Sequence, residues 1–138
     1  MGSFDEVVAQ RKATQKRRKK PSNEEHLIQS SCVSWFKLQH RSLRGRLIAV
    51  PNGGKRDEIT ASNLKEEGVV SGVSDLILLK PKGGYGALLI EMKTPKGTQS
   101  PSQKDWQKNL CAEEEYKYVV CRSLEDFMRE VNGYLKMM

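Results

Sequence analysis

Two apolar segments joined by a glycine-rich turn constrain the fold of this chain more than any other feature. Residues 76–79 and 87–90 are continuous runs of apolar side chains, the pattern of strands that are covered on both faces. Between them, residues 81–85 (Pro-Lys-Gly-Gly-Tyr) have the composition of a turn. The three segments predict an antiparallel hairpin centred on Gly83.

Three charged residues fall at one end of this hairpin. Asp75 opens the first strand, eight positions before Gly83, and Glu91 follows the second strand, eight positions after it. Such residues are cross-strand partners, with Cβ atoms roughly 5 Å apart on one face of the sheet. Lys93 lies two residues beyond Glu91, so it should point to the same face.

Two carboxylates and an amine at the end of a buried hairpin indicate a metal site. Carboxylates this close repel one another unless a cation lies between them, and hard oxygen ligands suit Mg²⁺ or Mn²⁺. The alternative is that Glu91 and Lys93 are solvated charges and that Asp75 is a cap or turn residue. The apolar strands favour the metal site, because α/β folds place their sites at the ends of such strands.

Composition narrows the functions open to the chain. Its 138 residues predict one domain with a modest core, and no run approaches the roughly 20 apolar residues of a membrane span. The first residues lack the apolar stretch of a secretory signal. Three widely spaced cysteines and two histidines argue against a zinc site and indicate a reducing compartment. We expect a cytoplasmic protein from a phage or bacterium, or a nuclear one if the source is eukaryotic.

The net charge of +7 is concentrated near the N-terminus. Residues 1–20 hold seven basic and two acidic residues, a net charge of +5, which leaves +2 for the other 118 residues. We expect a disordered basic arm over residues 1–21 and one folded domain over residues 22–138. The arm would add salt-sensitive affinity for phosphates, or it would serve as a nuclear localisation signal.

Periodicity and turn residues predict the other elements. These are a helix from Ser22 or Asn23 to about His40, a buried strand over 47–50, a short helix over 58–67, a helix from Ser100 or Ser102 to about Glu114, a strand over 116–121 and a helix over 124–135. With the hairpin, the order α-β-(α)-β-β-α-β-α predicts an α/β fold with a mixed sheet flanked by helices.

Two polar residues and one loop have two interpretations each. Glu25 forms a Ser-x-x-Glu capping box with Ser22, and it also lies beside the apolar stripe of its helix. Gln103 begins its helix, where it could reach the end of the sheet or be an ordinary surface residue. Residues 51–56 (Pro-Asn-Gly-Gly-Lys-Arg) form either a plain turn or a loop whose N–H groups approach a phosphate.

The order of these segments resembles a known nuclease family. The matching pieces are Glu25-His26-Leu27-Ile28-Gln29, Pro51-Asn52-Gly53-Gly54, Gly72-Val73-Ser74-Asp75, Glu91-Met92-Lys93-Thr94 with Lys96-Gly97, and Ser102-Gln103-x-x-Trp106. Together they look like the PD-(D/E)xK nuclease core, and more closely like the VRR-NUC (virus-type replication-repair nuclease) domain, over roughly residues 22–136. Ser74 departs from a pattern that often has Pro there, but that Pro is not a ligand.

The resemblance implies a restriction-endonuclease-like αβββαβ core and a metal-dependent DNA endonuclease that uses Mg²⁺ or Mn²⁺. Asp75, Glu91 and the backbone carbonyl of Met92 would hold the metal. Glu25 would complete the acidic pocket, directly or through water. The attacking water would be activated by the metal and displace the leaving group in line.

The resemblance also implies roles for polar and basic side chains. Lys93 would orient or deprotonate the attacking water and stabilise developing charge, and Gln103 would help to position that water or Lys93. The residues expected to contact nucleic acid are Asn52, Gly53, Lys55, Arg56 and Lys96.

Similar stand-alone domains resemble Holliday-junction resolvases, which implies branched DNA as the substrate and a homodimer. The candidate interface residues are apolar ones that the core is not expected to require: Trp35, Leu38, Leu43, Val69 and Val70. The alternatives are a nickase or restriction-like nuclease on ordinary duplex, and a non-catalytic DNA-binding module. The acidic pocket argues against a pure binder, because a phosphate-binding surface has no need of it.

Overall fold

The computed structural model describes residues 23–51 and 58–138. The basic arm, the boundary proposed at residues 21 and 22, and the capping residue Ser22 lie outside the described residues. So do four of the expected DNA contacts: Asn52, Gly53, Lys55 and Arg56.

The elements follow the predicted order, with one short 3-10 turn added. They are α2 (Asn23–Gln39), η1 (Arg41–Leu43), β1 (Leu47–Ala49), α3 (Glu58–Glu66), β2 (Leu76–Leu78), β3 (Leu88–Met92), α4 (Pro101–Cys111), β4 (Lys117–Cys121) and α5 (Leu124–Leu135). The strands form one mixed sheet in the order β1-β2-β3-β4, in which β3 and β4 are parallel and the other pairs antiparallel. The predicted α/β fold is therefore confirmed. Along the chain, α3 comes after the first strand and before the second strand of the αβββαβ core.

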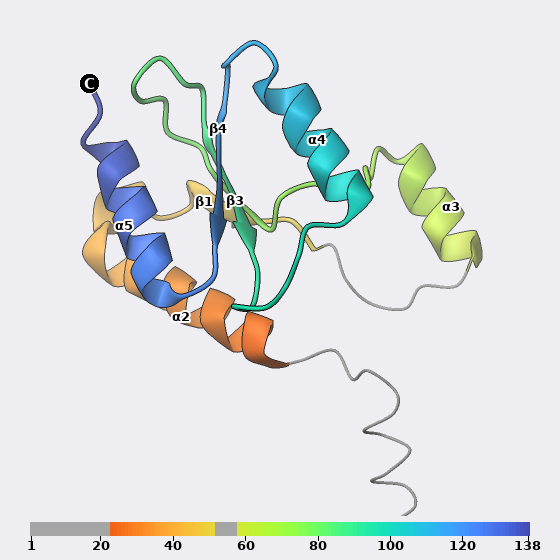
Figure 1. Ribbon diagram of the computed structural model, residues 1–138, viewed down its shortest axis with the longest axis horizontal. Helices are drawn as coiled ribbons and strands as arrows, with labels where there is room; N and C mark the ends of the chain where they lie inside the picture. Colours follow the sequence, from red (N-terminus) through yellow and green to blue (C-terminus); the bar gives the residue numbers. More distant parts are fainter. Residues whose placement is uncertain (1–22, 52–57) are drawn as a thin grey trace, which may run out of the picture.

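Helices cover both faces of the sheet (Figure 1). α2 and α5 pack against each other and against β3 and β4 on one face, and α4 packs against β4 on the other. None of the helices in the described ranges is long and apolar enough to span a membrane.

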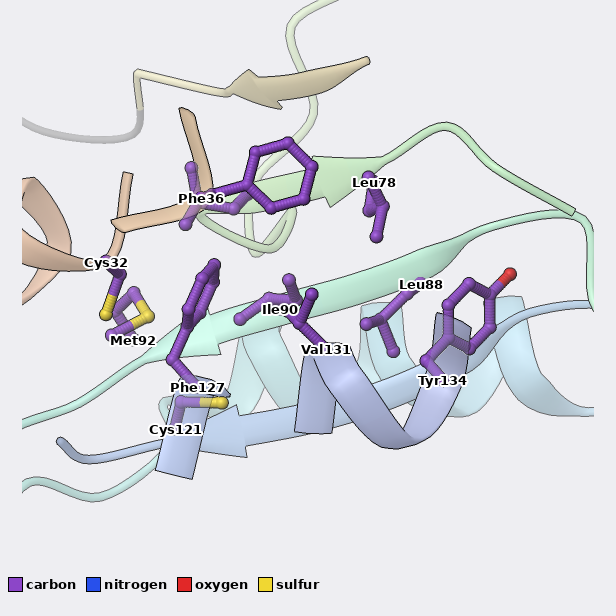
Figure 2. Close-up of a cluster of buried hydrophobic side chains, with 11 residues drawn as sticks. Cys32, Phe36, Leu78, Leu88, Ile90, Met92, Cys121, Phe127, Val131 and Tyr134 are labelled. Carbon is purple, nitrogen blue, oxygen red and sulfur yellow. The ribbon is translucent and has the colours of Figure 1, made fainter. Parts of the chain in front are cut away.

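The main core lies between the sheet and the α2–α5 layer (Figure 2). Alternate residues of β3, Leu88, Ile90 and Met92, are fully buried in it. The helices and other strands supply the remaining members: Cys32, Phe36, Leu76, Leu78, Cys121, Phe127, Val131 and Tyr134. Burial of each large apolar side chain contributes about 1.5–3 kcal/mol, so this layer holds the fold together.

Two expectations about burial were wrong. The strand over residues 47–50 was expected to be buried, but Ile48 is 40% exposed because β1 pairs with β2 alone and forms one edge of the sheet. Trp35 and Leu43 were expected to be free for a dimer interface, but both pack against the core. Trp35 makes an edge-on ring contact with Phe127 at a centroid distance of 5.9 Å.

The hairpin has the predicted register, although its turn is placed differently. Gly83 and Gly84 have φ angles of 58° and 85°, which suit a two-residue turn between Lys82 and Tyr85. Three residues then separate Leu78 from Lys82, but only two separate Tyr85 from Leu88. The extra residue on the β2 side compensates for the shifted turn.

As a result, Leu76 pairs with Ile90. One further step along the same register places Asp75 opposite Glu91, as the sequence predicted.

Candidate active site

The open end of the hairpin brings four of the predicted residues together. Asp75 immediately precedes β2, Glu91 lies in β3, Lys93 follows β3, and Glu25 lies in the first turn of α2. The charges of Asp75, Glu91 and Lys93 all act on the Glu25 carboxyl. Elements that are distant in sequence therefore form one charged cluster.

Asp75 is fixed by the neighbouring strand. Its Oδ2 atom accepts a hydrogen bond from the Met92 backbone N–H at 2.7 Å. Burial raises the pKa of Asp75, and the charge of Glu91 adds to this, while the Met92 bond and Lys93 partly offset it. The Lys93 N–H donates to the Cys121 carbonyl at 3.0 Å. This bond extends the β3–β4 pairing and fixes the backbone of Lys93.

Glu91 is completely buried, and its two oxygens have different surroundings. Its Oε1 atom accepts hydrogen bonds from the Tyr118 hydroxyl and from Gln99 Nε2, the latter at 3.2 Å. Among the residues that the structure describes, Glu91 Oε2 is the one buried side-chain polar atom without a hydrogen-bond partner. Such an atom is costly unless a ligand satisfies it, and a cation or a hydrogen-bond donor can do so for a carboxylate oxygen.

Glu25 is half-buried in the first turn of α2. Burial raises its pKa most, and the negative charges of Asp75 and Glu91 raise it further, while Lys93 lowers it. Within the described ranges, no three acidic, histidine or cysteine side chains are grouped closely enough to hold one ion together. The site therefore does not bring Asp75, Glu91 and Glu25 together as three direct ligands of one ion.

This donor set fits Mg²⁺ or Mn²⁺. Magnesium is commonly bound by one or two carboxylates and keeps several waters and substrate phosphates as its other ligands. The unpartnered Glu91 Oε2 supplies the free oxygen that such an ion requires.

The structure gives Gln103 a partner at the start of its own helix. Its Oε1 accepts from the Ser100 N–H at 2.8 Å, and its N–H bonds to Ser100 Oγ at 3.2 Å, which completes a capping box. Gln103 also lines a cavity of about 360 Å³ between α3, residues 69–73 and the start of α4. Its predicted action on the attacking water or Lys93 stays a prediction, and Gln99 is the glutamine that contacts Glu91.

Three residues of the site were missed by sequence reasoning: Gln99, Gln107 and Tyr118. Gln99 lies in a loop, where periodicity gives no signal, and Gln107 is one polar residue among several on α4. Tyr118 could have been found, because β4 was predicted and every second residue of a strand shares a face. Burial and the nearby Glu91 raise the pKa of Tyr118 well above its usual range.

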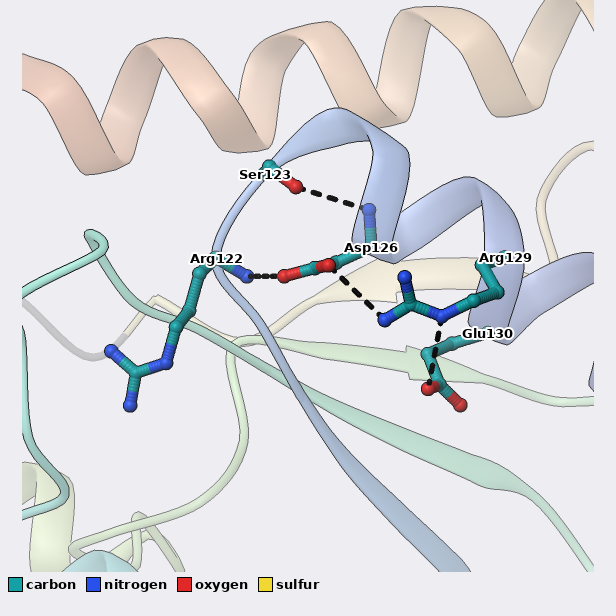
Figure 3. A network of polar contacts seen from close by, with 5 residues as sticks. All are labelled: Arg122, Ser123, Asp126, Arg129 and Glu130. Atoms are coloured by element: carbon teal, nitrogen blue, oxygen red, sulfur yellow. Dashed lines mark hydrogen bonds and ion pairs between the residues drawn. The ribbon is translucent and has the colours of Figure 1, made fainter.

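The loop after β3 carries Lys96, the one expected DNA contact that the structure describes. Lys96 is exposed, and the carbonyls around it are held by Arg122, whose Nη1 donates to Thr94 O at 2.8 Å and to Gly97 O at 2.6 Å. The Arg122 backbone N–H bonds to Asp126 at 3.0 Å (Figure 3). The loop that follows Lys93 is thus tied to the start of α5.

Comparison with known proteins agrees with this architecture. The VRR-NUC domain family matches residues 13–125. A solved structure described as a VRR_NUC domain protein superposes with a TM-score of 0.72 and 26% sequence identity, and the match covers 86% of this chain and 93% of that one. No curated protein matches the chain. The chain belongs to the VRR-NUC domain family and has its nuclease-type fold.

Proposed function

We propose that this domain is a metal-dependent endodeoxyribonuclease that hydrolyses phosphodiester bonds. The observation that carries the proposal is the buried Glu91 Oε2, on the residue opposite Asp75, which has no hydrogen-bond partner among the described residues. A purely structural carboxylate would be expected to satisfy both oxygens. Family membership supports the nuclease assignment, and the donor set supports the choice of Mg²⁺ or Mn²⁺.

Each residue has a proposed role. Asp75, Glu91 and the Met92 carbonyl would hold the ion, and Glu25 would complete the acidic pocket, directly or through water. The bound ion would supply Lewis acidity to the scissile phosphate and to the attacking water. Lys93 would orient or deprotonate that water and stabilise the negative charge that develops on the phosphate. Gln103 would help to position the water or Lys93.

DNA would be contacted by the basic segments of the chain. Lys96 is exposed on the loop after β3, where it can bind a phosphate next to the site. Asn52, Gly53, Lys55 and Arg56 would contact the backbone from a second loop. The basic arm would add sequence-independent, salt-sensitive affinity.

We further propose branched DNA as the substrate and a homodimer as the active form. One chain supplies one acidic cluster, whereas symmetric cutting of a four-way junction requires two, related by a two-fold axis. Of the apolar residues expected at the interface, Leu38, Val69 and Val70 are 60%, 43% and 53% exposed. They remain available to a second copy.

Cleavage of labelled linear duplex, flap and four-way junction in Mg²⁺, Mn²⁺ or EDTA tests the proposal. We expect cleavage in either metal, none in EDTA, and a preference for the junction. Glu91→Ala protein, purified in parallel, controls for a contaminating nuclease. DNA binding without cleavage in either metal would instead indicate a non-catalytic module.

Light scattering at micromolar concentration tests the dimer. A species at the chain mass of 15.7 kDa, with junction cleavage still first order in enzyme, would exclude an obligate dimer. That result would favour a nickase or restriction-like nuclease on ordinary duplex.

A further inference from the structure

We propose that the Tyr118 hydroxyl and the Gln99 amide are positioning groups that hold one oxygen of Glu91 and thereby direct the other toward the metal. This inference rests on the proposed function, because it concerns how the metal-binding carboxylate is oriented. Neither residue would touch the ion or the DNA. Both would act through Glu91.

The hydrogen bonds at Glu91 are strongly asymmetric. Tyr118 and Gln99 both donate to Oε1, whereas Oε2, equally buried, has no partner among the described residues. A carboxylate that needed only neutralisation could share its donors between its oxygens. Two donors on one oxygen instead fix the rotation of the carboxylate and leave the second oxygen for another ligand.

The Gln99 amide is itself held in the orientation that this role requires. Its Nε2 atom donates to Glu91 Oε1 at 3.2 Å and to Gln107 Oε1 at 2.8 Å. An amide nitrogen carries two hydrogens, and both acceptors are oxygens that cannot donate. The amide oxygen therefore points away from Glu91.

The Tyr118 hydroxyl is placed by its strand and by α4. β3 and β4 are parallel with Leu89 beside Tyr118, so Tyr118 lies on the same face of the sheet as Leu89 and Glu91. On that face its ring lies 6.2 Å from the ring of Trp106, measured between centroids. α4 thus braces both donors, Tyr118 through Trp106 and Gln99 through Gln107.

Partners of metal ligands commonly govern metal affinity. Such groups fix the orientation of the ligand before the ion arrives, and their removal typically costs about 10–100-fold in affinity or activity. The competing explanation is that Tyr118 and Gln99 only compensate a buried charge. In that case their loss would change the free energy of unfolding and leave the metal affinity of the folded protein unchanged.

The test is Mn²⁺ binding by isothermal titration calorimetry on the full chain, without DNA. Tyr118→Phe removes the hydroxyl and retains the ring, and we expect its affinity to fall about 10–100-fold. The matched control is Tyr116→Phe, which removes a hydroxyl two residues earlier and leaves both donors to Glu91 in place. Urea unfolding in EDTA gives the folded fraction of each variant.

A second variant keeps the test decisive if Tyr118→Phe does not fold. Gln107→Met has a similar length, removes the acceptor that anchors Gln99, and leaves Glu91 with both donors. We expect a weaker loss of Mn²⁺ affinity than in Tyr118→Phe, in the same direction. The loss of Mn²⁺ affinity in Gln99→Met should be intermediate between those of Gln107→Met and Tyr118→Phe.

The outcomes separate this inference from the proposed function. If the wild-type chain binds Mn²⁺ and the folded Tyr118→Phe and Gln107→Met variants bind it equally well, the positioning role is overturned and the nuclease proposal stands. If the wild-type chain binds no Mn²⁺ at all, the metal site itself is wrong and both proposals fail.

Discussion

The two faces of the sheet have opposite chemistry, although the same strands build them. On the α2–α5 face, Ile90 and Met92 are fully buried among other apolar side chains. On the α4 face, Glu91 is equally buried, but one oxygen of its carboxylate has no partner in the part of the chain that the structure describes. Because strand residues alternate between faces, one five-residue strand, β3, serves both the core and the candidate site.

This difference means that stability and activity can be changed separately. The α2–α5 face gains free energy from apolar burial, whereas the α4 face holds a buried carboxylate that has to be compensated by hydrogen bonds or a cation. Functional sites of this kind commonly lower the stability of the protein that carries them. Substitutions on one face should therefore affect folding, and substitutions on the other should affect cleavage.

The largest effect is expected from the two carboxylates. Asp75→Ala or Glu91→Ala should abolish metal-dependent cleavage and leave DNA binding unchanged or stronger, because each change removes a metal ligand and a negative charge near the phosphate. Cleavage assays and binding by fluorescence anisotropy check this. Wild-type-like cleavage by either variant would mean that the site lies elsewhere.

The opposite face should give the complementary result. Phe127→Ala empties a fully buried position in the core and should lower the free energy of unfolding by about 3–5 kcal/mol. Urea unfolding measures the loss. At low temperature, the cleavage rate per folded molecule should stay near that of the wild type. A large loss of this rate in a variant that is still folded would contradict the separation of the two faces.

Lys93→Ala tests the site without removing a metal ligand. One well-placed charged donor contributes about 10²–10³-fold to the rate, so single-turnover cleavage should slow by this factor while Mn²⁺ affinity changes little. Lys96→Ala is the matched control, because it removes a lysine from the same loop and should mainly weaken DNA binding. A Lys93→Ala rate equal to that of the wild type would assign Lys93 a structural role.

The sequence predicted one face of the sheet better than the other. Periodicity predicted a helix over residues 124–135, its bounds agree with those of α5, and Phe127, Val131 and Tyr134 on this helix are buried in the core. The register of the hairpin was also predicted, but the turn lies at Gly83 and Gly84, and the register is kept only because one extra residue on the β2 side compensates. The helix depends on local geometry, which sequence spacing encodes, whereas the compensating residue in the hairpin could not be inferred from spacing alone.

The hydrogen bonds around Glu91 could not be predicted in the same way. Gln99 reaches Glu91 from a loop, and its amide is set by Gln107 on α4, so their arrangement depends on how α4 docks onto the sheet. Gln103 had the clearer sequence signal, a Ser-x-x-Gln pattern at a helix start. The structure uses that pattern for a capping box.

The smallest expected effect is on the free energy of unfolding, and it concerns two aspartates whose pKa values are shifted in opposite directions. Burial raises the pKa of Asp75. The pKa of Asp126 is lowered, first by the hydrogen bond from the Arg122 N–H, and also by Arg129 and Ser123 (Figure 3). The two carboxylates should therefore contribute to stability with opposite signs near pH 7.

The direction of each effect follows from proton linkage. Native Asp75 keeps its proton to higher pH than the unfolded chain does, so its contribution to stability falls as the pH rises from the unfolded pKa, roughly 3.9, through the folded pKa. Native Asp126 loses its proton more readily, so its stabilisation is present above the unfolded pKa and is lost as the pH falls through the folded pKa. Metal-free protein is required, because a cation would offset the cost at Asp75.

Urea unfolding in EDTA between pH 3 and pH 7 should separate the two aspartates. Asp75→Asn should raise the free energy of unfolding at pH 7, and this gain should vanish at low pH, where the wild-type carboxyl is also neutral. Asp126→Asn should lower it at pH 7, by a small amount because solvent screens this partly exposed carboxylate, and this effect should shrink toward pH 3. If Asp75→Asn instead destabilised the metal-free protein at pH 7, Asp75 would be an ordinary structural carboxylate. The two aspartates would then contribute to stability with the same sign.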